Sequence, residues 1–82
     1  ERCDEMSDVA EMIMENRQLG VSMSKQIRVF NNNSSDSRAL WYEVVSEAYK
    51  RPRFSTSENR EKIVTDFGNA VYQECYQAMT GK

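Results

Sequence analysis

Residues 3–20, CDEMSDVAEMIMENRQLG, show the clearest helical pattern in this chain. Apolar side chains recur there three and four residues apart, a spacing that places them on one face of an α-helix. They are Cys3, Met6, Val9, Ala10, Ile13 and Met14. Carboxylates fill most of the opposite arc of the helix. We therefore expect Met12 and Glu15 to be exposed, and Val9 and Ile13 to be buried.

The next segment predicts a helix end, a short helix and a loop. Gly20 can adopt the left-handed conformation that ends many helices. Ser22 is placed to cap a short second helix, because serine is favoured at the N-cap. The side chains expected to point inward from that helix are Met23, Ile27 and Phe30. Residues 31–37, NNNSSDS, form a polar loop.

A third helix is predicted to begin at a cap formed by Asp36 or Ser37 and to run to about Lys50. Pro52 ends it, since the residue before a proline is pushed out of the helical region. Its apolar side chains cover about half of its circumference, which indicates contact with more than one neighbour and a central position. They are Leu40, Trp41, Val44, Val45, Ala48 and Tyr49.

Residues 55–58 match the capping box S-x-x-E and predict the start of a long fourth helix that reaches about Met79. Its apolar stripe consists of Ile63, Val64, Phe67, Ala70, Val71, Cys75 and Ala78. Gly68 costs about 1 kcal/mol inside a helix relative to alanine, which points to a close approach of another backbone there. The sequence therefore predicts an all-α fold, a compact bundle of four helices (one of them short) in a single domain of residues 1–82.

Cys3 and Cys75 lie near opposite ends of an 82-residue chain. Two free thiols packed on helices are one alternative, and a disulfide is favoured because so small a core benefits from a cross-link. The bond would contribute roughly 4 kcal/mol. It would make the first and fourth helices antiparallel neighbours. Arg17, one helix length away, would then contact Glu58 or Glu61.

Several classes of function are disfavoured by composition. The net charge is −2, which gives no overall attraction for nucleic acid or an acidic membrane surface. Histidine is absent, and with it the commonest general base and zinc ligand. Residues 22–25 fit the S-x-x-K motif of serine acylases, but a helix cap followed by a surface lysine explains them as well. We expect no catalysis, metal, cofactor or membrane insertion.

Three surface features are candidates for contact with a partner. The basic segment 50–54, with Arg51 and Arg53, is interpreted as a loop anchored by aromatic residues or as a protein-contact loop. Tyr72 and Tyr76, four residues apart, are either covered by the second helix or form an exposed interface patch. The acidic arc of the first helix is a solvated face or a site for a basic partner.

Three motifs follow the first cysteine: M-x-x-R-Q-x-G-V-S-M over residues 14–23, Y-x-x-P-R-F-S over 49–55 and Y-x-x-C over 72–75. In this combination the chain resembles a group of small exported proteins of Gram-negative bacteria and their prophages. The resemblance implies a cleaved signal and a periplasmic location, and it carries over no catalytic residue. It marks Arg17, Gln18, Gly20, Pro52 and Arg53 as fixed features of the group.

These observations together favour a small exported interaction protein that binds another protein and has no catalytic activity. The alternative is a structural or stress-related periplasmic protein without a dedicated partner. Because the chain begins at Glu1 and not at methionine, either a segment has been removed or the sequence begins inside a longer protein. A cleaved export signal would explain both this start and the cysteines, so we expect a periplasmic or secreted location. The sequence leaves the partner unidentified and is compatible with a homodimer. The candidate partner-binding residues are Tyr72, Tyr76, Arg17, Arg51 and Arg53.

Overall fold

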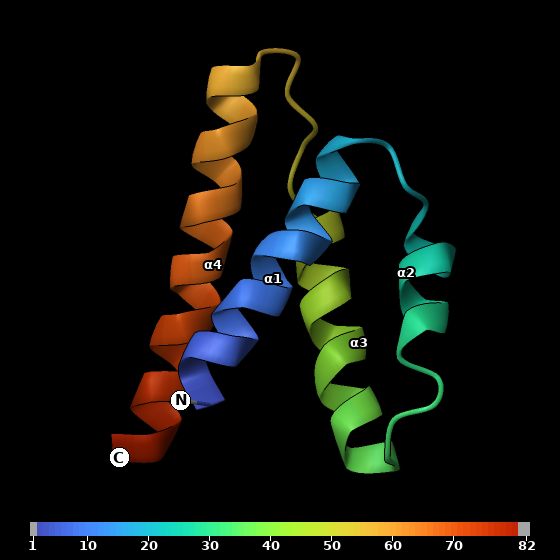
Figure 1. The fold of residues 1–82 in the computed structure, drawn as a ribbon, viewed down its shortest axis with the longest axis vertical. Helices are drawn as coiled ribbons and strands as arrows, with labels where there is room; N and C mark the ends of the chain where they lie inside the picture. Colours follow the sequence, from blue (N-terminus) through green and yellow to red (C-terminus); the bar gives the residue numbers. More distant parts are fainter. Residues whose placement is uncertain (1, 81–82) are drawn as a thin grey trace.

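A computed structural model describes residues 2–80, apart from the side chains of Arg2 and Asp36. This part of the chain holds four α-helices and no strand: α1 (Arg2–Gln18), α2 (Met23–Val29), α3 (Ser35–Tyr49) and α4 (Ser57–Thr80) (Figure 1). The prediction of an all-α fold with four helices, one of them short, is confirmed.

The end of α1 is fixed by Gly20, whose φ of 93° lies in the left-handed region. Its N–H donates to the Arg17 carbonyl at 3.1 Å, and the N–H of Val21 donates to the Asn16 carbonyl at 3.0 Å. This pair of hydrogen bonds is a Schellman motif. Ser22 then caps α2 as predicted and accepts a hydrogen bond from the Lys25 N–H at 3.3 Å.

The cap of α3 differs from the prediction. Ser34 is the N-cap, and its hydroxyl accepts from the Ser37 N–H at 3.4 Å. Neither Asp36 nor Ser37 occupies the cap position, because the helix begins before both of them. A run of asparagine and serine offers several residues suited to capping, so the pattern alone does not select one.

The cap of α4 also differs from the prediction, but it lies after the predicted residue. Thr56 Oγ1 accepts from the Asn59 N–H at 3.2 Å, and α4 begins at Ser57. The capping box that the sequence predicts from Ser55 to Glu58 is therefore wrong by one residue. Threonine is also a favoured N-cap, and the loop that ends at Phe54 determines which hydroxyl lies at the helix start.

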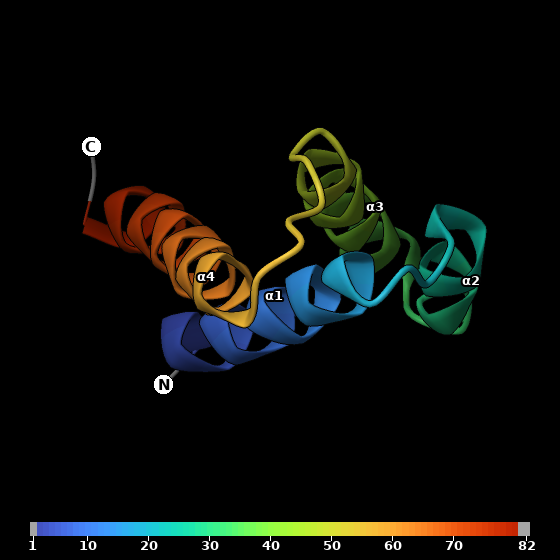
Figure 2. The same ribbon diagram turned by 90° about the horizontal axis from the view of Figure 1, so that it is seen from above.

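The helices are arranged around α1. α1 and α4 run antiparallel and are joined by the Cys3–Cys75 disulfide, with the two Cα atoms 5.6 Å apart, so this prediction is confirmed (Figure 1). α3 also packs on α1, at a distance from α4, and α2 packs on α3 (Figure 2). The wide apolar arc of α3 therefore contacts two helices as predicted, while α1 shares the central position.

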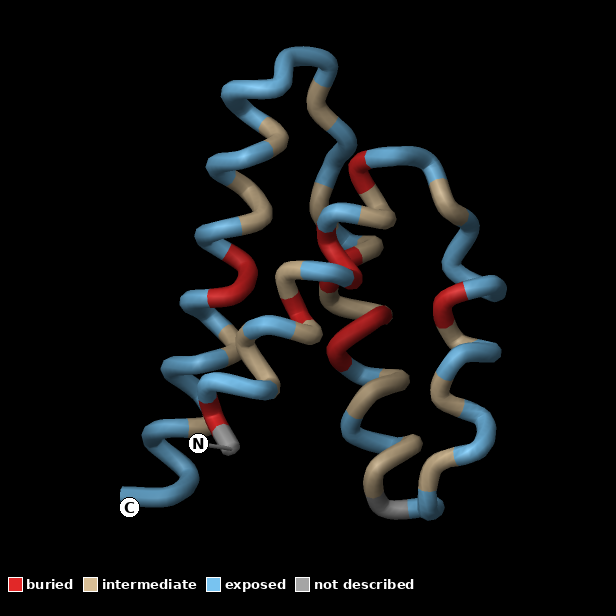
Figure 3. The backbone as a smooth tube through the Cα atoms, viewed as in Figure 1, coloured by how far each residue is buried: buried red, intermediate tan, exposed pale blue. Residues whose placement is uncertain are grey.

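The core contains apolar residues of three helices (Figure 3). They are Cys3, Ala10, Ile13, Met14, Val44, Val45, Ala48 and Phe67. Met12 and Glu15 are exposed and Ile13 is buried as predicted, while Val9 is only partly buried.

Several apolar residues that were expected to lie inward are exposed. They are Met23, Leu40, Ala70 and Ala78. In α2 the buried residue is the polar Gln26, because that helix contacts its neighbours through a hydrogen-bonding side chain. In α3 and α4 the exposed residues border a groove, described below.

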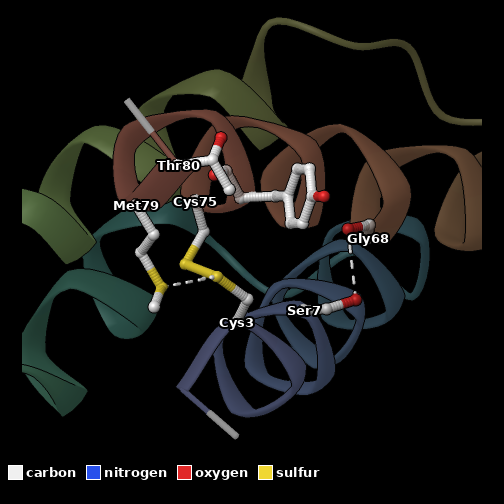
Figure 4. The surroundings of a disulfide bond; sticks show 7 residues. Cys3, Ser7, Gly68, Cys75, Met79 and Thr80 are labelled. Carbon is white, nitrogen blue, oxygen red and sulfur yellow. Dashed lines mark hydrogen bonds between the residues drawn. A yellow bond between two sulfur atoms is a disulfide. The ribbon is translucent and has the colours of Figure 1, made fainter. Parts of the chain in front are cut away.

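At Gly68, α4 packs directly against side chains of α1. A Cβ atom at this position would lie 2.5 Å from Glu11 Cγ. Ser7 Oγ donates to the Gly68 carbonyl at 3.1 Å, and these two residues lie close to the disulfide (Figure 4). Gly68 is therefore closely packed, but the crowding atoms belong to the Glu11 side chain and not to another backbone as predicted.

Replacing Gly68 with alanine is expected to lower the free energy of unfolding by about 1 kcal/mol, because overpacking outweighs the gain in helix propensity. In a Glu11→Ala background, where the crowding atoms are gone, Gly68→Ala should instead stabilise the protein by about 0.5–1 kcal/mol. Urea denaturation of the four proteins of this double-mutant cycle measures the coupling. Equal effects of Gly68→Ala in both backgrounds would contradict the assigned contact.

Candidate functional site

The loop between α3 and α4 is held by Gln18, the last residue of α1, which is only 2% exposed. Its Nε2 donates to the Pro52 carbonyl at 2.9 Å, and its Oε1 accepts from the Phe54 N–H at 2.8 Å. A buried amide side chain therefore satisfies a donor and an acceptor of the loop backbone. This contact joins the R-Q segment (17–18) to the P-R-F segment (52–54), although the two lie far apart in the sequence.

Arg17 binds the same loop. Its Nε and Nη2 donate to the Arg51 carbonyl at 3.1 and 2.9 Å, and its guanidinium lies 4.9 Å from the centre of the Tyr49 ring. Among the described residues it forms no ion pair with Glu58 or Glu61, so the predicted contact with α4 is wrong. α1 and α4 diverge away from the disulfide (Figure 1). The hydrogen bonds of Arg17 place it at the end of α3 and not beside α4.

Gln26 links α1, α2 and α3. Its Nε2 donates to the Ile13 carbonyl at 2.9 Å and to Tyr49 Oη at 3.0 Å, and its Oε1 accepts from Asn16 Nδ2 at 3.3 Å. Tyr49 Oη in turn donates to the Val21 carbonyl. Gln26 could not be recognised from the sequence, since a glutamine in a mostly polar helix gives no signal of burial.

The other two candidate arginines also have contacts within the protein. Arg53 Nε donates to the Gln18 carbonyl at 3.3 Å, and its guanidinium packs against Gly20, 3.4 Å from where a Cβ would lie. The Arg51 guanidinium lies 5.0 Å from the centre of the Phe67 ring. The basic segment is therefore anchored through its arginine side chains, whereas the prediction gave the anchoring to its aromatic residues, and a role of this loop in protein contact stays a prediction.

Tyr72 and Tyr76 form an exposed pair on α4. Their rings stack with centroids 6.5 Å apart, and the residues are 38% and 54% exposed. α2 lies on the far side of α3 from α4, so it does not cover them (Figure 2). The two tyrosines therefore form an exposed patch, and the alternative that the second helix covers them is wrong. It does not bring the pair together with the three arginines.

A groove of about 550 Å³ runs between α3 and α4, with Met6 of α1 also among its lining residues. Most of its lining is apolar. These residues are Met6, Leu40, Val44, Phe67, Ala70, Val71, Ala78 and Met79. Figure 2 shows that α3 and α4 lie apart from each other on one side of α1. No residue pattern predicted it, because it depends on how far two helices diverge.

Charged residues line the groove on both walls. Glu47 binds Lys50 at 3.1 Å and Arg51 at 3.5 Å, and the hydrogen bond from Lys50 is the main cause that lowers its pKa below the ordinary value. Glu43 on α3 and Glu74 on α4 also line it. Within residues 2–80 neither of these two carboxylates has an ion pair or a side-chain hydrogen bond.

A second groove of about 480 Å³ lies between the end of α1 and the start of α4, where these helices diverge. Leu19 is its most exposed apolar residue, and Arg60 in its wall donates to the Phe54 carbonyl at 2.9 Å. Its apolar lining is smaller, with Leu19 and Val64 as the large aliphatic residues.

Two further findings concern the part of the chain that the structure describes. It contains no group of three or more cysteine, aspartate or glutamate side chains arranged to hold a metal ion. None of its helices combines the length and the hydropathy that crossing a membrane requires.

Comparisons of this chain with protein-family models, with curated proteins and with solved structures find no match. Its function must therefore be inferred from its own residues and surfaces.

Proposed function

We propose that this chain is a small exported protein that binds another protein through the groove between α3 and α4, without catalytic activity of its own. The observation that carries the proposal is the apolar lining of this groove, in which Leu40 is 44% and Met79 62% exposed. Contiguous exposed apolar surface on a small folded protein typically marks an interaction site.

The shape of the groove favours a helix of the partner as its occupant. Its two walls are helices that both lie on one side of α1, so an added helix would contact both of them (Figure 2). Helices pack with their axes about 8–10 Å apart by inserting the ridges of one into the grooves of the other. An amphipathic helix in an apolar groove is a recurrent mode of peptide recognition.

Export is supported by the disulfide, because such bonds persist in oxidising compartments and are rare in the cytosol. The resemblance to small exported proteins points to the same location. We therefore assign the protein to the periplasm or to the secreted fraction of its source.

Replacing Leu40 with lysine should weaken partner binding at least about tenfold, because a charge would enter the apolar contact surface. Leu19→Lys is the matched control, since Leu19 is exposed in the second groove. The measurement is affinity capture from periplasmic extract with the wild type and both variants, after thermal unfolding shows that all three fold. We expect one stoichiometric protein bound by the wild type and Leu19→Lys and lost with Leu40→Lys. Absence of such a protein, or its retention by Leu40→Lys, would overturn the proposal.

A further inference from the structure

We infer that the helix bound in this groove carries basic residues along both edges of its apolar stripe. This inference rests on the proposed function and names the chemistry of the partner. It follows from the length of the groove, from the charges on its two walls and from what this chain itself can offer as an occupant.

The length of the groove sets the length of the helix. Along α4 its lining runs from Phe67 to Met79, 13 residues that span about 18 Å of helix. The contact of Arg51 with the Phe67 ring lies at one end, and the exposed Leu40 and Met79 lie on the lining as well. A partner helix lying along the groove therefore needs about 12 residues or more.

The charges on the walls set the polarity of its edges. Glu43 projects from the α3 wall and Glu74 from the α4 wall, both exposed and both without an ion pair among the described residues. Arg51, the basic residue of the lining, is already engaged by Glu47 and Phe67. Lysine and arginine suit such edges, because their stems lie on apolar surface while the charged ends reach the carboxylates.

A second copy of this chain fits the groove less well. Its own short helix α2 has 7 residues, about 10 Å, which is little more than half of the lining on α4. The chain also carries a net charge of −2, so the carboxylates on the walls would meet another acidic protein. A separate basic, amphipathic helix satisfies both the length and the charge.

The test uses two labelled helical peptides with the same apolar stripe, one with lysine and one with glutamate along both edges. Fluorescence anisotropy at low salt should show that the wild type binds the basic peptide about tenfold more tightly, as expected for two exposed ion pairs. The double variant Glu43→Lys/Glu74→Lys should reverse this preference. In 1 M salt, where the Debye length is about 3 Å, the preference should nearly disappear.

The matched control is Asp8→Lys/Asp66→Lys, two exposed acids outside the groove lining. Each double variant replaces two negative charges with two positive ones, which changes the net charge from −2 to +2. The control should keep the preference for the basic peptide. A reversed preference in the control would show attraction by overall charge alone and would overturn the inference.

Other outcomes separate the inference from the proposed function. Equal binding of both peptides to the wild type, abolished by Leu40→Lys, would overturn the inference that the partner helix has basic edges. The groove would still be the binding surface. Binding of neither peptide would overturn both. A dimer in sedimentation that is lost in Glu43→Lys/Glu74→Lys would identify a second copy as the occupant and would also overturn the inference.

Discussion

Replacing Cys3 and Cys75 with alanine is expected to lower the free energy of unfolding by about 4 kcal/mol. The two residues are 72 positions apart, so the disulfide removes much of the conformational entropy of the unfolded chain. Small domains have a total stability of about 5–15 kcal/mol. A domain at the lower end of this range would keep only about 1 kcal/mol of stability without the bond.

Urea denaturation followed by circular dichroism measures this effect on the oxidised wild type and the double alanine variant. The reduced wild type is the control, because it keeps both sulfur atoms and loses only the cross-link. Its stability should be close to that of the variant. A difference below about 1 kcal/mol between oxidised and reduced protein would show that the unfolded chain gains little freedom without the bond.

The disulfide also contributes to the groove. Cys75 is one of the lining residues, and Met79 Sδ lies 3.5 Å from Cys3 Sγ (Figure 4). The last turns of α4 are thus fixed to α1 beside one wall of the groove. The cross-link therefore helps to hold the α4 wall of the groove in place.

The features of the fold that follow from short-range patterns were predictable from sequence. The apolar spacing in α1 gives its buried face, and Gly20 ends it because a left-handed residue is needed there. Gly68 identifies the helix contact because a larger residue would collide with Glu11. The caps of α3 and α4 were placed wrongly, since each follows a run in which several hydroxyl side chains are suitable.

The site was less predictable because it depends on helix divergence and on bonds between side chains and backbone. A straight antiparallel pair would bring Arg17 to the start of α4, whereas in the structure it donates to the Arg51 carbonyl. Carbonyl oxygens belong to every residue, so such partners leave no pattern in the sequence. Leu40 has the helical spacing of a core residue, but it is exposed because α3 and α4 lie apart where it borders the groove.

Replacing Gln18 with leucine is expected to lower the free energy of unfolding by about 3 kcal/mol. The volume changes little, but the Pro52 carbonyl and the Phe54 N–H lose their buried partner, and each unpaired group costs about 1–3 kcal/mol. Gln73→Leu is the matched control, because Gln73 is exposed on α4 and its loss should change stability by less than about 0.5 kcal/mol. Urea denaturation gives both values.

Hydrogen exchange of the Phe54 amide tests the cause of this loss, since its protection should fall in Gln18→Leu and persist in Gln73→Leu.

Gln18→Glu separates the two hydrogen bonds further. The new carboxylate can accept from the Phe54 N–H but cannot donate to the Pro52 carbonyl, and burial raises its pKa. Its stability relative to the wild type should therefore rise as the pH falls through that raised pKa, because the protonated carboxyl can donate again. A relative stability that is independent of pH, or a Phe54 amide that stays protected in Gln18→Leu, would mean that the loop is held by Arg17 and Arg60 and not by Gln18.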